Sequence, residues 1–221
     1  MQRIIFVGLL FGALSHTAFA ASFDCSKAKS EMEKAICSDQ KLSALDEHLG
    51  RYYAVAVEEL KDGASCLKAE QRDWVKTKRN PCAANVACLT AAYMKRLGAL
   101  DALQPGASAV KYIELPMVPG LVAAIPPEAD MVAEKSTKPL EIKGHLLHET
   151  VDTNNMGYAV KQTNGQSVAF VLDMNIGNSA SHTMVSDLIE QQASSKFVVR
   201  GWSTAQLGFD LGRCRMIYRL P

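Results

Sequence analysis

Six cysteines are the residues of this sequence with the clearest capacity for chemistry. An even number of cysteines in an exported chain is typical of disulfide bonds, because compartments outside the cytoplasm are oxidising. A metal site is the alternative, but the sequence has no Cys-x-x-Cys pair and its histidines are scattered. We therefore predict disulfides and no metal. The cysteines are Cys25, Cys37, Cys66, Cys82, Cys88 and Cys214.

Three polar side chains, His145, His148 and Glu149, are close enough in sequence to suggest a metal site of another kind. On a strand, His145 and Glu149 share one face and His148 points to the other. The pattern therefore favours a half-buried strand with polar ends. His48 is expected on the solvated side of its helix, and His182 is expected to cap a late helix or to lie on the surface.

Signatures of hydrolytic enzymes are missing from the sequence. The segment Gly177–Ser181 lacks the last glycine of a G-x-S-x-G elbow. There is also no phosphate-binding glycine loop and no H-E-x-x-H helix. A Cys–His nucleophile is disfavoured, since exported cysteines normally form disulfides. The chain is therefore predicted not to be an enzyme and to use no cofactor.

Asp73 and Trp74 lie on a predicted helix and could line a cleft. A tryptophan in such a place is more often part of the core, here packed on Tyr52 or Tyr53 of the preceding helix. The bases that follow are expected to be solvated and to complement the helix dipole. These bases are Lys76, Lys78 and Arg79.

The first 20 residues have the pattern of a secretory signal peptide. Arg3 precedes the apolar run Ile4–Leu14, and the small-residue site Ala18–Ala20 follows. The run has 11 residues, fewer than the roughly 20 of a membrane-spanning helix. Ser22, Phe23 and Asp24 stand where a lipidation box would precede Cys25. We predict cleavage after Ala20 and a periplasmic or secreted protein without a membrane anchor.

The charge balance argues against polyanionic partners. Arg3 is one of 24 basic residues, so the chain after residue 20 has 23 bases and 23 acids. A chain without net charge lacks the basic surface that nucleic acid or an anionic membrane attracts.

Residues 21–103 read as a helical domain. Ser30 and Glu33 form a capping box, and apolar residues then recur at a spacing of three to four. Short loops between the helices imply an antiparallel hairpin or bundle. The expected helices span residues 31–37, 39–60, 65–78 and 85–103. Residues 104–138 are expected to be a proline-rich linker, extended or irregular, in which 110–115 could form a strand.

Residues 139–221 read as a small β domain, which makes the fold class α+β. The expected strands are 140–151, 158–163, 166–174, 196–202 and 213–220, with a helix at 183–192. Asn164-Gly165 is a strong hairpin turn. Three strands, a helix and two strands is the order of an OB-like barrel, although other small barrels and rolls also fit. Aromatic side chains of this part could stack on a glycan, but core packing is favoured for most of them; they are Tyr158, Trp202, Phe209 and Tyr218.

The helical part resembles the LprI-type lysozyme inhibitor family over residues 23–100. The resemblance rests on the cores E-K-A-I-C and Q-R-D-W and on four cysteines at the spacing of the family. Cys66 and Cys214 fall outside that pattern. The matching stretches are Phe23–Ala28, Glu33–Asp39, Leu42–Asp46, Tyr53, Glu70–Val75, Arg79–Cys82, Ala87–Leu89 and Ala92–Leu97. The resemblance implies a secreted helical domain that inhibits lysozyme, but it assigns no target-binding residue.

The cysteine pairing follows from loop length only in part. Cys82 and Cys88 flank a short loop and can form a local bridge. Cys25 could fold back to Cys37, but a continuous helix would separate them by ~18 Å, beyond the ~7 Å limit for a disulfide. Residues 25–29 would then have to be non-helical. The pair Cys66–Cys214 remains by elimination.

The favoured function is inhibition of a lysozyme or another peptidoglycan hydrolase by protein binding. A basic lysozyme would favour an acidic inhibitor surface, and residues 24–47 contain six acids and four bases. Two alternatives are a module that binds a glycan, peptide or partner through the β domain, and an immunity protein against a cell-wall hydrolase. An exposed acidic or aromatic loop on the helical domain would favour inhibition, and a concave aromatic groove on the β domain would favour glycan binding.

Overall fold

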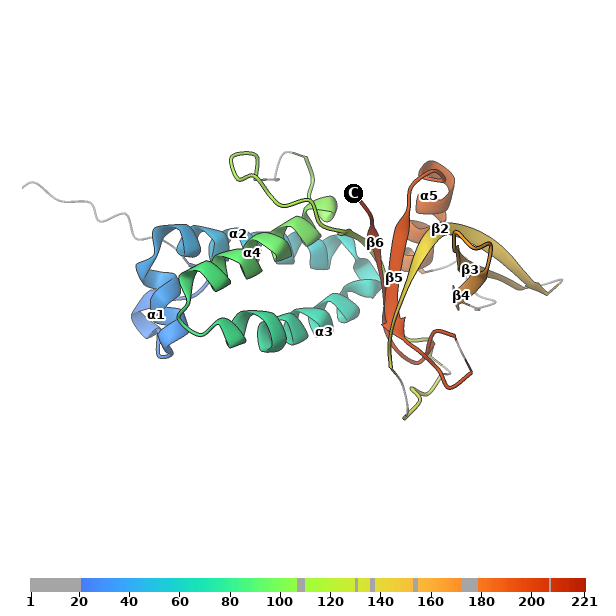
Figure 1. Ribbon diagram of the computed structural model, residues 1–221, viewed down its shortest axis with the longest axis horizontal. Coiled ribbons are helices and arrows are strands. Elements are labelled where there is room, and N and C mark those ends of the chain that lie inside the picture. Colours follow the sequence, from blue (N-terminus) through green and yellow to red (C-terminus); the bar gives the residue numbers. More distant parts are fainter. Residues whose placement is uncertain are drawn as a thin grey trace, which may run out of the picture.

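A computed structural model describes residues 21–106, 110–129, 131–135, 138–152, 155–171, 179–206 and 208–221. The expected signal peptide therefore lies outside the described residues. Helices fill the first half of the chain, and an antiparallel sheet with one helix fills the second (Figure 1). The predicted α+β class is confirmed.

The helical part begins with a capping box at Ser30, whose side chain accepts from the amide of Glu33. Asp39 and Asn85 cap the helices that follow them in the same way, because their side chains satisfy amides that the first helical turn leaves free. Helix α3 continues into a π-helical turn, Val75–Arg79, and a 3-10 turn, Asn80–Cys82. The helices are α1 (Glu31–Ser38), α2 (Gln40–Glu59), α3 (Ala64–Trp74) and α4 (Val86–Leu100).

Helices α2, α3 and α4 extend from the sheet side by side, and α1 lies at their far end (Figure 1). Their buried stripe includes Leu42, Leu45, Leu49 and Tyr52 of α2, at the spacing of one helix face. The prediction of a helical N-terminal part is confirmed.

The sheet has the strand order β1-β6-β5-β2-β3-β4, with every pair antiparallel. The first half of β2 pairs with β5 and the second half with β3. At the change of partner, a Cβ on Gly144 would lie 2.1 Å from the carbonyl oxygen of Lys161, so only glycine fits. The elements are β1 (Gly120–Ile125), β2 (Pro139–Asp152), β3 (Asn155–Lys161), β4 (Ser167–Val171), α5 (Ala180–Gln191), β5 (Phe197–Trp202) and β6 (Arg215–Arg219).

Two expectations for this half need correction. The described strands form an open sheet with β1 and β4 at its edges, so the OB-like barrel is not what forms. The segment 104–138 is more than a linker, because it supplies β1, which is buried from Leu121 to Ile125. Residues 110–115 are not a strand. The amide of Val110 instead donates to the hydroxyl of Tyr52 on α2, and Leu115 packs on the helical core.

One face of the sheet packs on the helical part and the other on a second core. On β6, Met216 and Tyr218 join the helical core, whereas Ile217 joins the core beneath α5. On β5, Val198 faces the helices and Val199 faces α5. The helical part and one face of the sheet therefore share a core, and the opposite face forms the second core with α5. Both cores draw on the same strands, because alternate residues of a strand point to opposite faces.

Polar and covalent contacts reinforce that junction. Cys66 of α3 is disulfide-bonded to Cys214, the residue before β6. The carboxylate of Asp62, just after α2, accepts from the amide of Ser181 at 2.9 Å and from its hydroxyl at 2.6 Å, at the start of α5. A Cβ on Gly63 would lie 2.3 Å from the carbonyl oxygen of Ala124 in β1, which shows how closely the α2–α3 corner approaches the sheet.

Candidate functional site

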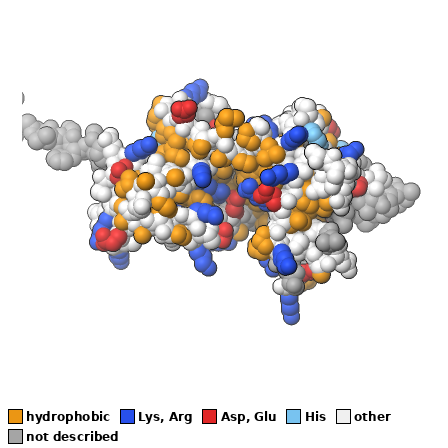
Figure 2. Space-filling model, viewed as in Figure 1, with side chains coloured by type: hydrophobic (Ala, Val, Ile, Leu, Met, Phe, Trp, Pro, Cys, Tyr) orange, Lys and Arg blue, Asp and Glu red, His pale blue; other side chains and the backbone are white. Residues whose placement is uncertain are grey.

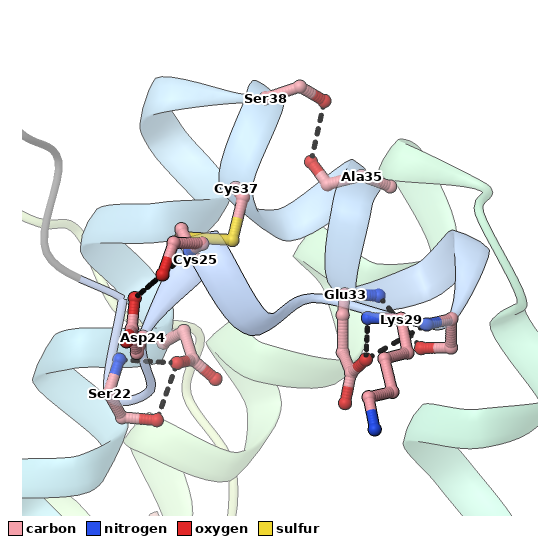
Figure 3. The surroundings of a disulfide bond; sticks show 11 residues. Ser22, Asp24, Cys25, Lys29, Glu33, Ala35, Cys37 and Ser38 are labelled. Atoms are coloured by element: carbon pink, nitrogen blue, oxygen red, sulfur yellow. Dashed lines mark hydrogen bonds between the residues drawn. A yellow bond between two sulfur atoms is a disulfide. The ribbon is translucent and has the colours of Figure 1, made fainter.

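Three disulfides brace the chain, and no cysteine in the described residues is free. Cys25–Cys37 closes the start of the helical part, where residues 25–27 form a single 3-10 turn rather than an extension of α1 (Figure 3). Glu33 stabilises the same region, since its carboxylate accepts from the amides of Lys29 and Ser30 (Figure 3). The other bridges are Cys66–Cys214 and Cys82–Cys88.

The four histidines that the structure describes do not converge on a metal site. His145 and Glu149 are half-buried and His148 is exposed beside Tyr158, as expected for a strand with polar ends. Within the described ranges, no group of three or more His, Cys, Asp or Glu side chains could hold a metal ion. His182 neither caps the helix nor lies on the surface: it is buried in the first turn of α5, and its amide donates to the capping hydroxyl of Ser179.

His48 differs from its expected solvated position. Its side chain is buried, and one ring nitrogen lies 2.7 Å from the hydroxyl of Tyr112. The other nitrogen contacts the guanidinium of Arg51. The segment after residue 109 crosses α2 and covers this side of the helix, which the apolar periodicity of α2 alone does not reveal.

Trp74 is part of the core, as predicted, but with a different partner. Its ring packs edge-on against Tyr93 of α4, with centroids 5.6 Å apart, rather than on Tyr52 or Tyr53. The indole is 9% exposed and borders two hollows, one on each side of α3. Lys76 and Lys78 are exposed, as expected, whereas Arg79 is half-buried.

The first hollow lies between α2 and α3 and has a volume of about 530 Å³. Asp46 lines it and is buried. Its carboxylate accepts from the hydroxyl of Tyr93 at 2.6 Å, and from the amide and hydroxyl of Ser22 at 2.7 and 2.6 Å. Burial and the negative charge of Asp46 raise the pKa of Tyr93, so the phenol stays protonated and acts as a donor. This bonding makes Asp46 a structural anchor between α2, α4 and the start of the described chain.

The second hollow is a groove bounded by α3, α4 and the sheet, also about 530 Å³. A chain of polar contacts runs along its floor. Arg96 of α4 donates to Gln71 and to Glu70 of α3, both at 2.9 Å. Glu70 also accepts from the hydroxyl of Tyr218 on β6. The guanidinium of Arg200 lies over the Tyr218 ring, 4.6 Å from its centroid.

The helical part divides into two arms of opposite charge. Residues 21–60, which include α1 and α2, contain eight acids and five bases. Residues 61–104, which include α3 and α4, contain four acids and eight bases. Charged side chains gather where the helical part meets the sheet (Figure 2). The acidic arm therefore attracts basic partners, and the basic arm attracts acidic partners.

The aromatic residues of the β part are mostly core. Tyr158, Phe209 and Tyr218 are buried, as predicted, and are not available to stack on a glycan. Trp202 is 38% exposed, and the guanidinium of Arg213 lies 5.1 Å from its ring centroid. An aromatic glycan platform on this part would therefore depend on Trp202 alone among the four candidates.

Comparison with known families identifies the helical part. Residues 25–106 match the family model described as Lysozyme inhibitor LprI. The matching part, residues 25–106, is called the LprI domain below. The E-Q-R-D-W run of this domain lies on α3, and its side chains divide between the two hollows: Gln71 and Arg72 line the first, Glu70 and Asp73 the second, and Trp74 both.

No curated protein and no solved structure matched the chain. None of the described helices combines the length and apolar character that a membrane crossing requires. No local pattern indicated that Arg200 and Tyr218 would line a groove with LprI residues, because Tyr218 and Glu70 are 148 positions apart.

Proposed function

We propose that this protein is exported, is cleaved near Ala20, and inhibits a lysozyme-type muramidase by binding to it through the LprI domain. The match of residues 25–106 to the lysozyme inhibitor family carries the proposal. The chain acts in this account as a binding protein and not as an enzyme. Disulfides at Cys25–Cys37 and Cys82–Cys88 suit a periplasmic or secreted location.

The charge division supports α2 as the contact surface. Helix α2 carries Glu47, Glu58 and Glu59, of which the last two are exposed, against the exposed bases Lys41 and Arg51. Arg51 is paired with Glu47. A basic muramidase would be steered toward this arm and away from the basic α3–α4 arm, since complementary charge raises the association rate and like charge opposes docking. The proposed contact is therefore the α1–α2 side of the domain.

The direct test is the hydrolysis of peptidoglycan by a lysozyme, titrated with the oxidised chain 21–221. The whole chain is needed because the LprI domain shares its core and the Cys66–Cys214 disulfide with the sheet. We expect activity to fall to its minimum near one inhibitor per enzyme. Full activity of several lysozyme types at a large molar excess of the chain would contradict the proposal and favour another cell-wall hydrolase or a ligand of the β part.

A further inference from the structure

The groove between α3, α4 and the sheet has cations that its own acids do not neutralise. Four basic side chains line it, whereas its acidic residues are Glu70 and Asp73. Glu70 is already engaged, because it accepts from both Arg96 and Tyr218. The basic residues are Lys78, Lys95, Arg96 and Arg200. A concave site with an excess of one charge concentrates ligands of the opposite charge.

These cations differ in how they are held. Arg96 is 5% exposed and fixed by Gln71 and Glu70, yet its Nη2 has no hydrogen-bond partner among the described residues. Buried donors normally have partners, so this guanidinium has unused donor capacity. None of the ion pairs in the described part of the chain involves Lys78 or Lys95. Both ammonium groups are therefore free to meet an anion at the rim.

The remaining wall of the groove is apolar and made of small side chains. Helix α4 contributes alanines, and the segment before β1 contributes Val118 and Pro119. The alanines are Ala91, Ala92 and Ala99. Such a wall leaves room for small apolar groups and gives inorganic anions nothing to pack on. The site thus combines a cationic floor and rim with an apolar side.

We infer that this groove binds a short peptide by its free carboxylate, with small apolar side chains of the peptide packed on α4. Lys95 and Lys78 contact the carboxylate at the rim, and Arg96 supplies fixed positive charge beneath it, whereas the charge of Arg200 beside it is already balanced by an ion pair with Glu141. The inference is independent of muramidase inhibition, because the groove lies on the basic arm and the proposed muramidase contact lies on the acidic arm.

Trp74 provides a direct readout, because it lines the groove and the chain has two tryptophans. In Trp202→Phe it becomes the sole tryptophan. Its fluorescence is titrated with N-acetyl-alanyl-alanine in the L,L and D,D forms, and with the corresponding amides. We expect saturable binding of at least one carboxylate form and about tenfold weaker binding of its amide. Preference for the L,L form would indicate an ordinary peptide, and preference for the D,D form a cell-wall stem peptide. Equal binding of acid and amide, or no saturable change with either, overturns the inference.

A matched pair of variants locates the site. Lys95→Gln should weaken binding of the preferred acid about threefold to tenfold. Lys76→Gln removes the same charge from a residue that does not line the groove and should leave the affinity unchanged. Equal losses in both variants would mean general charge attraction and would overturn the site. Lysozyme inhibition, measured on the same two variants, should match that of the unmodified chain, so failure of either proposal is visible separately.

Discussion

The hydroxyl of Tyr218 on β6 donates a hydrogen bond to the carboxylate of Glu70 on α3, and the same carboxylate accepts from Arg96 on α4. A residue of the sheet thus completes a polar network of the LprI domain. Burial, reinforced by the negative charge of Glu70, raises the pKa of Tyr218, so the phenol remains a donor. The LprI domain and the sheet consequently behave as one packed unit.

Tyr218→Phe should lower the free energy of unfolding by ~1–3 kcal/mol, because it leaves one oxygen of Glu70 without its donor. Urea denaturation of the oxidised chain measures the change. Tyr53→Phe is the control, since Tyr53 is only half-buried and its hydroxyl makes no hydrogen bond between the two layers among the described residues. Equal effects of the two substitutions would show that the Tyr218–Glu70 bond contributes nothing specific.

The disulfides should differ in their contributions to stability. Cys66–Cys214 closes a loop with a sequence separation of 148, whereas Cys82–Cys88 has a separation of 6. The chain-entropy estimate gives about 5 kcal/mol for the first and about 2 kcal/mol for the second. Denaturation of the two double-alanine variants compares them, and peptide mapping without reductant tests the pairing. A free thiol at either Cys66 or Cys214, or equal losses of stability, would contradict the account.

Acidification should destabilise the protein through His48. Burial, helped by the nearby Arg51 charge, lowers the pKa of His48. In the unfolded chain the pKa of His48 is about 6.5, so as pH falls the unfolded chain binds the proton before the folded chain does. Stability from this group is present above that pH and is lost as pH falls toward the folded pKa. The urea midpoint should drop between pH 7.5 and 5.5, and less so in His48→Gln. The same drop in both chains would exclude His48 as its cause.

The corner between α2 and α3 should not tolerate a side chain. In Gly63→Ala the new Cβ would lie 2.3 Å from the backbone oxygen of Ala124, so backbone must shift. We expect a loss of ~1–3 kcal/mol in unfolding free energy. Gly106→Ala is the matched change, because nothing lies within 4 Å of its added Cβ. If Gly63→Ala were as stable as Gly106→Ala, the close approach of the corner to β1 would be wrong.

Local sequence signals anticipated the elements better than their assembly. The capping box at Ser30 and the periodicity of α2 placed the helices, and Asn164-Gly165 marks the turn between β3 and β4, where Gly165 has φ +85°. The open sheet was not anticipated, because β1 comes from a proline-rich segment with no alternating pattern. An edge strand formed by distant pairing leaves little local signal.

The candidate site was anticipated only on its LprI side. The Q-R-D-W run pointed to α3, and Trp74 does border both hollows. The sheet side of the groove depends on Arg200 and Tyr218, which approach Glu70 only after β5 and β6 pack on the helices. The burial of His48 by the segment that carries Tyr112 is a second long-range contact of this kind.

The most direct test of the central claim is the inhibition constant for a basic lysozyme at low ionic strength, measured for two matched variants. Glu58→Gln with Glu59→Gln removes two exposed acids from the end of α2, and Asp187→Asn with Glu190→Gln removes two exposed acids from α5, beyond the sheet. The account predicts inhibition by the unmodified chain, about threefold to tenfold weaker inhibition by the α2 variant, and no change for the α5 variant. Absence of inhibition by the unmodified chain, or equal weakening in both variants, would contradict it.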